Sequence, residues 1–159
     1  VDRRQRQMCI RDRKKSLLAI YSSISSNGEK METFEPKPFE KEMTFLKSMG
    51  EHTEIPHFLN KDDFDYYLNE FTRGGMRGPI NWYRNIDRNW EMTKDTHDKK
   101  ISPLACFIVG EDDPVAKWTL INPSLHENLV SSHTIKSAGH WVQQEKPEEV
   151  NKLLLDFFK

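Results

Sequence analysis

Two polar segments each follow a stretch of the sequence that is predicted to be a strand. Asp112 and Asp113 come directly after the apolar run at 104–109, and His140 follows a second predicted strand at 131–136. In open parallel sheets, active sites collect beyond the carboxyl ends of the strands. A carboxylate and an imidazole on neighbouring loops there suit a general base that an acid holds in its working tautomer. The spacing alone fits a surface turn and a capping histidine equally well.

A second candidate for chemistry is the aromatic segment at 77–90, which reads RGPINWYRNIDRNW. Pro79 suits a first helical position, because its missing N–H has no partner to lose there. Helical spacing then puts Trp82 and Ile86 on one face with Tyr83 beside them. The Tyr83 hydroxyl can donate a hydrogen bond from this otherwise apolar wall. On spacing alone, the simpler interpretation is an ordinary helix that buries its rings in a core.

The elements that must position the aromatic segment are predicted to be helical. Apolar residues recur at helical spacing over 17–24, which indicates an amphipathic helix. Asn60 followed by acidic residues is typical of a helix start, and Gly74-Gly75 ends the apolar stripe that follows. The segment 29–54 lacks periodicity and contains two prolines, so a long loop is expected there. Together with the helix from Pro79, this predicts an all-helical block.

The elements that must position the acid and the histidine are predicted to alternate. The apolar run at 104–109 is typical of a parallel strand buried on both faces, and 131–136 is predicted to be a second strand. Pro147 opens a helix with an apolar face. Helices and strands that alternate after an all-helical block predict an α/β fold, specifically the tail of a parallel sheet.

The composition excludes several classes of function. The chain has 159 residues, a mean hydropathy of -0.79, a net charge of -1 and a pI near 6.7. This charge gives no reason to expect nucleic acid or an anionic membrane as a partner, and no apolar run is long enough to span a membrane. Cys9 and Cys106 make no disulfide framework, so a reducing, cytoplasmic location is expected. No metal-ligand spacing and no glycine-rich phosphate loop occurs, so no metal or cofactor is expected.

Several segments together resemble the epoxide hydrolases of the α/β-hydrolase superfamily. The segment from Arg77 matches the family's cap-domain motif Arg-Gly-Pro-(Leu/Ile)-Asn-Trp-Tyr-Arg-Asn, and 59–67 matches the helix before it. The segment 110–115 matches the family's Gly-Glu-X-Asp-X-Val, and 139–147 matches Gly-His-Trp-X-Gln-X-(Glu/Asp)-Lys-Pro. The resemblance implies the C-terminal part of an α/β-hydrolase fold, a parallel sheet flanked by helices, preceded by part of a helical cap.

The resemblance also implies a role for individual residues. His140 takes the position of the general base and Asp113, not Asp112, takes that of its acid partner. Tyr83 takes the position of one of two cap tyrosines that hold and protonate the epoxide oxygen. Trp82 and Trp141 are expected to bind substrate as walls of the pocket. The implied reaction hydrolyses a small-molecule epoxide with water to a vicinal diol through a covalent alkyl-enzyme ester, without a cofactor.

The family's nucleophile, its oxyanion turn and its first cap tyrosine have no match in this sequence. We therefore expect 14–98 to be a partial cap, 99–159 to be the C-terminal part of the core, and the chain alone to be inactive. Residues 1–13 are a basic block, and its second half can be back-translated into a DNA sequence that resembles the end of a transposase-based sequencing adapter. We expect this leader to be non-native, the alternative being a disordered basic arm.

Two other functions stay open at this point. A haloalkane or haloacid dehalogenase of the same superfamily would share the acid and the histidine, but would favour halide-binding groups over Tyr83 in the cap. A non-enzymatic interaction module with a degenerate hydrolase fold would predict that the gene itself starts near residue 1. The sequence leaves the oligomeric state, the particular epoxide and the stereochemistry undetermined.

Overall fold

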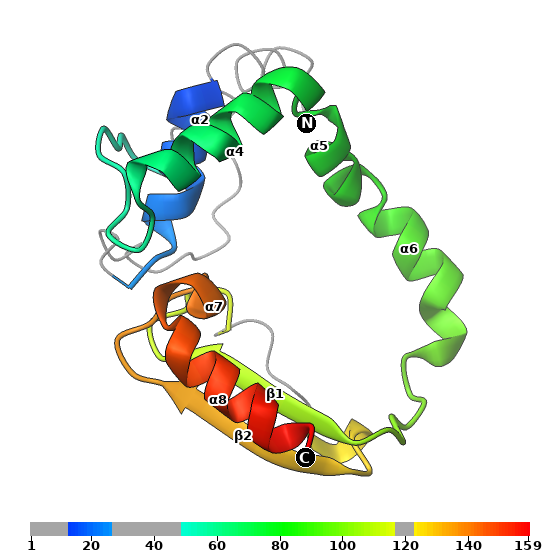
Figure 1. Ribbon diagram of the computed structural model, residues 1–159. Coiled ribbons are helices and arrows are strands. Elements are labelled where there is room, and N and C mark those ends of the chain that lie inside the picture. Colours follow the sequence, from blue (N-terminus) through cyan, green and yellow to red (C-terminus); the bar gives the residue numbers. More distant parts are fainter. Residues whose placement is uncertain (1–12, 27–48, 117–122) are drawn as a thin grey trace.

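A computed structural model of the chain describes residues 13–26, 49–116 and 123–159. Residues 1–12 of the expected leader and most of the expected loop at 29–54 lie outside this part. In Figure 1 the ribbon follows an open arc, with the helices at 13–23 and 61–74 at one end, those at 77–84 and 86–93 along the middle, and the strands with the helices at 142–145 and 147–157 at the other end. The curve of the arc brings its two ends side by side, since the Glu145 side chain accepts a hydrogen bond from the Ser26 N–H, just beyond the first helix.

The first end of the arc is a pair of packed helices, α2 (Arg13–Ser23) and α4 (Lys61–Gly74). The predicted start of α4 is confirmed, because the Asn60 side chain accepts a hydrogen bond from the Asp63 N–H at 2.8 Å. Gly75, with φ of 71°, ends the helix in a backbone conformation that favours glycine. Phe64, 1% exposed, is the centre of a core cluster that also contains Leu17, Leu18 and Leu59.

The amphipathic pattern predicted for α2 is only partly confirmed. The buried residues of the helix are not a single apolar stripe but include three serines alongside Leu17, Leu18 and Ala19. The reason is that α2 has neighbours on more than one side. It packs on α4 through its leucines, while the segment that follows it contacts the chain around His140.

The middle of the arc departs from the predicted single helix. Two short helices, α5 (Arg77–Arg84) and α6 (Ile86–Thr93), are separated at Asn85, whose side chain donates to the Asn81 carbonyl at 2.8 Å. The 3-10 turn η1 (Lys94–Thr96) continues the arm. Every residue from 81 to 104 is exposed. The interpretation of these rings as core residues is therefore wrong for this chain.

The last part of the chain is a two-stranded parallel sheet with helices. β1 (Ala105–Gly110) pairs with β2 (Leu129–Ile135), and the predicted parallel pairing is confirmed. The connection includes the 3-10 turn η2 (Pro123–Leu125), and α8 (Pro147–Phe157) lies along the strands (Figure 1). Ile135, Ala138 and Val150 form the buried core between them.

The strand β1 is less buried than its apolar sequence predicts. Its first five residues are half-buried and only Gly110 is fully buried. A parallel strand is buried on both faces only where helices cover both, and within the described residues the core cluster packs α8 against one face. A short helix that the sequence did not predict, α7 (Val142–Glu145), precedes α8.

Candidate functional site

The carboxyl ends of β1 and β2 bring the predicted acid and the predicted histidine to the same edge of the sheet. Beyond the strands, the Glu111 N–H donates to the Ile135 carbonyl and the Asp112 N–H donates to the Ala138 carbonyl, both at 2.9 Å. The two loops approach so closely that a Cβ atom on Gly110 would lie 2.2 Å from the Gly139 carbonyl oxygen. Glycine at position 110 is thus required by the contact that positions the site.

An imidazole and a carboxylate form the centre of the site. The Nδ1 atom of His140 lies 3.1 Å from Oδ1 and 3.2 Å from Oδ2 of Asp113. Asp113 is 9% exposed, whereas Asp112 is exposed, so the structure separates two acids that are neighbours in sequence. The Asp113 Oδ1 atom also accepts the Val115 N–H at 2.8 Å, which fixes the carboxylate from the other side.

This geometry determines what the imidazole can do. An ionised carboxylate only accepts hydrogen bonds, so the Asp113 side chain favours the tautomer with the proton on Nδ1. The Nε2 atom then carries the lone pair. Among the described residues Nε2 has no hydrogen-bond partner. The pair therefore has the arrangement of a general base oriented by an acid.

The α2 end of the arc is docked against the segment that carries the histidine. We call this contact region the joint, and define it by Tyr21, Ile24, Tyr67, His140 and Trp141. The His140 backbone N–H donates to the Ile24 carbonyl at 2.8 Å. The rings of Tyr21 and Trp141 have centroids 4.8 Å apart, Tyr21 stacks on Tyr67 at 5.6 Å, and His140 meets Trp141 edge-on at 5.1 Å.

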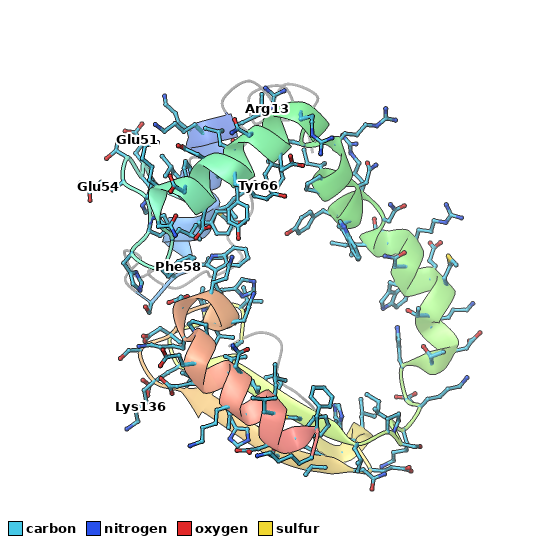
Figure 2. The ribbon with its side chains drawn as sticks, in the orientation of Figure 1. Arg13, Glu51, Glu54, Phe58, Tyr66 and Lys136 are labelled. Atoms are coloured by element: carbon cyan, nitrogen blue, oxygen red, sulfur yellow. The ribbon has the colours of Figure 1, made fainter. Side chains whose placement is uncertain are left out.

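Polar contacts extend the joint to α4 and α7. The Gln144 side chain donates to the Tyr67 hydroxyl oxygen at 3.0 Å. Burial in the joint, and secondly the neighbouring Tyr67, raises the pKa of Tyr21 above its ordinary value. In Figure 2, Phe58, whose ring meets Tyr21 edge-on, lies on the side of α4 toward α7, while Glu51 and Glu54 lie on the outer side. Sequence analysis predicted the helices of Tyr21 and Tyr67 but not their contact with the histidine segment.

Tyr83 and Trp82, the other predicted site residues, are placed differently. Their side chains are 75% and 79% exposed on α5, where they line a surface hollow. The remaining lining residues of this hollow are Gly78, Pro79, Ile86 and Asn89. Among the described residues, no hydrogen bond or ring contact joins Tyr83 or Trp82 to Asp113 or His140. The structure thus brings together Asp113, His140 and Trp141. It leaves the two α5 residues exposed, without a described contact to Asp113 or His140.

Metal-binding clusters and membrane-spanning helices are both absent from the described part of the chain. It contains no group of three or more histidine, cysteine or acidic side chains that could hold a metal ion. None of its helices has both the length and the apolar character needed to cross a membrane.

Comparison with known proteins gives consistent results. No protein-family model matches the chain. It is 41% identical over 120 residues to epoxide hydrolase A of Mycobacterium tuberculosis, an alignment covering 71% of this chain and 36% of that protein. It is 32% identical over 120 residues to bifunctional epoxide hydrolase 2 of Rattus norvegicus, and this alignment covers 72% of this chain and 21% of that protein.

Solved structures extend the similarity to nearly the whole chain. The structure of an epoxide hydrolase from an endophytic Streptomyces aligns with this chain with a TM-score of 0.87 and 30% identity. The alignment covers 99% of this chain and 49% of that protein. Epoxide hydrolase A from Mycobacterium thermoresistibile aligns with a TM-score of 0.79 and 32% identity, and this alignment covers 94% of this chain and 47% of that protein. The chain thus spans under half the length of these proteins, and by sequence and fold it belongs to the epoxide hydrolases of the α/β-hydrolase superfamily.

Proposed function

We propose that the whole protein of which this chain is a part is an epoxide hydrolase that converts epoxides to vicinal diols through a covalent alkyl-enzyme ester. The observation that carries the proposal is the contact of His140 Nδ1 with the Asp113 carboxylate at 3.1 Å, at the carboxyl ends of two parallel strands. The similarity to proteins named epoxide hydrolases supports the substrate class.

The first step in this proposal opens the epoxide. A carboxylate nucleophile, for which no segment of this sequence is a match, attacks an epoxide carbon, and the carbon–oxygen bond breaks as an ester forms. Tyr83 donates its hydroxyl proton to the oxygen that leaves the carbon. The exposed position of Tyr83 beside Trp82 in an apolar hollow supports this role, because the hydroxyl is not engaged with another described residue.

The second step hydrolyses the ester. His140 Nε2 takes a proton from water, the water oxygen attacks the ester carbonyl, and the tetrahedral intermediate collapses to the free carboxylate and the diol. The proton that the imidazole took from water is left over, and it restores the Tyr83 hydroxyl. Asp113 stabilises the imidazolium that forms and keeps the ring oriented. Trp141, in edge-on contact with the imidazole at 5.1 Å, forms a wall of the site together with Trp82.

This assignment divides the chain into two functional parts. We assign 14–98 to a partial cap, which supplies Tyr83 and Trp82, and 99–159 to part of the hydrolase core, which supplies Asp113 and His140. We also propose that the chain alone turns over no epoxide, because it contributes a base and a proton donor but no nucleophile.

A chimera tests the proposal directly. This chain replaces the homologous part of Mycobacterium tuberculosis epoxide hydrolase A, which supplies the remaining length, and hydrolysis of styrene oxide to the diol is measured. We expect activity in the chimera and none in the purified 159-residue chain. Hydrolysis by the chain alone that is lost in His140→Ala would contradict the missing nucleophile. A folded chimera that acts on haloacids or haloalkanes but not on epoxides would favour the dehalogenase alternative.

A further inference from the structure

We propose that Glu145 is a positioning residue for His140, which holds the turn carrying the imidazole through a single carboxylate oxygen. Glu145 lies at the end of α7, five residues beyond the histidine in sequence. It is not a catalytic residue, since no described contact joins it to Asp113 or to the imidazole. Its effect on catalysis rests on the proposed function above, whereas its effect on the geometry of the histidine does not.

The Glu145 carboxylate joins two distant parts of the backbone. Its Oε2 atom accepts the N–H of Gly139, the residue before His140, at 3.0 Å. The same oxygen accepts the N–H of Ser26 at 3.0 Å, across 119 positions of sequence. Hydrogen bonds to an ionised acceptor are roughly twice as strong as neutral ones. One side chain thus ties the histidine turn to the end of the segment that follows α2.

The surrounding packing makes this tie specific. The His140 N–H donates to the Ile24 carbonyl at 2.8 Å, so a direct backbone hydrogen bond joins the two segments beside the Glu145 bridge. A Cβ atom on Gly139 would lie 2.5 Å from the Ser25 carbonyl carbon, which shows how closely the backbones approach. Because this turn leads directly into His140, any relaxation of it moves the imidazole relative to Asp113.

The second carboxylate oxygen points to a dedicated role for the charge. Glu145 Oε1 is buried and has no hydrogen-bond partner among the described residues. Burying the Oε1 atom without a hydrogen-bond partner costs free energy. A glutamate that served only to stabilise the local helix would not need to bear this cost. In the described structure, the gain that offsets this cost is the pair of bonds made by Oε2.

The test uses the full 159-residue chain and needs no enzymatic activity. Long-range proton–nitrogen spectra of the imidazole, in mildly alkaline solution where an ordinary histidine is neutral, report which ring nitrogen carries the proton. We expect the Nδ1–H tautomer in the unaltered chain and its loss in Asp113→Ala, which validates the signal as a report on the pair. Glu145→Leu, which keeps the size but removes the acceptor, is expected to lose the Nδ1–H tautomer as well.

Matched variants separate positioning from general stability. Glu148→Leu, at an exposed glutamate in the first turn of α8, is expected to leave the tautomer unchanged. Glu145→Gln keeps one oxygen that can accept both N–H groups but loses the charge. It is expected to retain the tautomer. The Gly139 and Ser26 amides are expected to exchange with solvent roughly tenfold faster, and a tenfold change corresponds to about 1.4 kcal/mol.

Each outcome decides the proposal. A folded Glu145→Leu chain that retains the Nδ1–H tautomer overturns it. If Glu145→Leu does not fold, unchanged exchange at Gly139 and Ser26 in Glu145→Gln overturns it, and tenfold faster exchange confined to these two amides supports it. A chimera without epoxide hydrolysis but with the expected tautomer results refutes the proposed function and leaves the role of Glu145 intact.

Discussion

The joint and the α5–α6 arm both carry residues proposed to act on the substrate, yet the chain holds them in opposite ways. In the joint, His140 is fixed by the Asp113 carboxylate, by the Ile24 carbonyl and by the ring of Trp141. On the arm, Tyr83 and Trp82 have no contact in the described residues beyond their own arm, and both are exposed. The proposed base is therefore preorganised within this chain, whereas the proposed proton donor is only presented by it.

The arm also shows that large apolar side chains do not make a core by themselves. Trp82, Tyr83, Ile86, Trp90 and Met92 are all more than half exposed. Contiguous exposed apolar surface marks an interaction site or a ligand-binding surface in a soluble protein. The rings of the joint are half-buried instead, because three segments of the chain contact one another there.

The largest effect is expected at Asp113, the acid that contacts His140. In the chimera, Asp113→Asn should lower kcat by about 10⁴, because an amide no longer enforces the Nδ1–H tautomer. Asp112→Asn, one residue earlier and exposed, is the matched control and should leave kcat within about twofold. Steady-state hydrolysis of styrene oxide measures both. Equal losses would mean that the burial of Asp113 does not distinguish the two acids, and a larger loss in Asp112→Asn would identify Asp112 as the partner of His140.

A difference in stability should separate a buried ring from an exposed one. Phe64→Ala removes a side chain that is 1% exposed and should lower the free energy of unfolding by about 3–5 kcal/mol. Trp90→Ala, which removes a larger ring that is 62% exposed, should change it by less than about 0.5 kcal/mol. Urea unfolding of the chain, followed by circular dichroism, gives both values. A large loss in Trp90→Ala would show that the arm packs more tightly than described.

The hydroxyl on the arm should matter for rate and not for folding. Tyr83→Phe in the chimera should lower kcat by about 10²–10³, the range for removing one preorganised donor to a developing negative charge. The melting temperature should stay the same, because the hydroxyl has no partner among the described residues. Tyr66→Phe removes the hydroxyl of another exposed tyrosine, which Figure 2 labels on α4, and should leave kcat unchanged. Full activity in Tyr83→Phe argues against its role as proton donor.

The smallest effect expected is a change in the pKa of Tyr21, a residue of the joint. Burial raises the pKa of Tyr21 in the folded chain above its unfolded value near 10. The group therefore stabilises the fold fully below pH of about 10, and this stabilisation is lost as the pH rises through the folded value. Ultraviolet difference titration of the chain and of Tyr21→Phe isolates this transition. Trp141→Ala, which uncovers the ring, should lower the pKa of Tyr21 toward the ordinary value.

Much of the fold could be predicted because its signals are local. The Asn60 cap and Gly75 define the ends of α4, the apolar run at 104–109 identifies β1, and the alternation of helices and strands predicts the parallel sheet. The break between α5 and α6 was not predicted, because the Asn85 side chain competes for a backbone carbonyl in the middle of an unbroken helical pattern. The half-burial of β1 was not predicted either, since a run of apolar residues gives no count of the helices that cover it.

Local sequence signals specified most of the elements, their order, and a set of motifs that placed an acid before a histidine. The tertiary structure alone brought the Asp113 carboxylate to His140, exposed the rings of the arm, and set Glu145 against an N–H that lies 119 positions away. The physical reason is the range of the forces involved. Capping and periodicity act between residues a few positions apart, whereas the orientation of a side chain depends on backbone groups that only folding brings near.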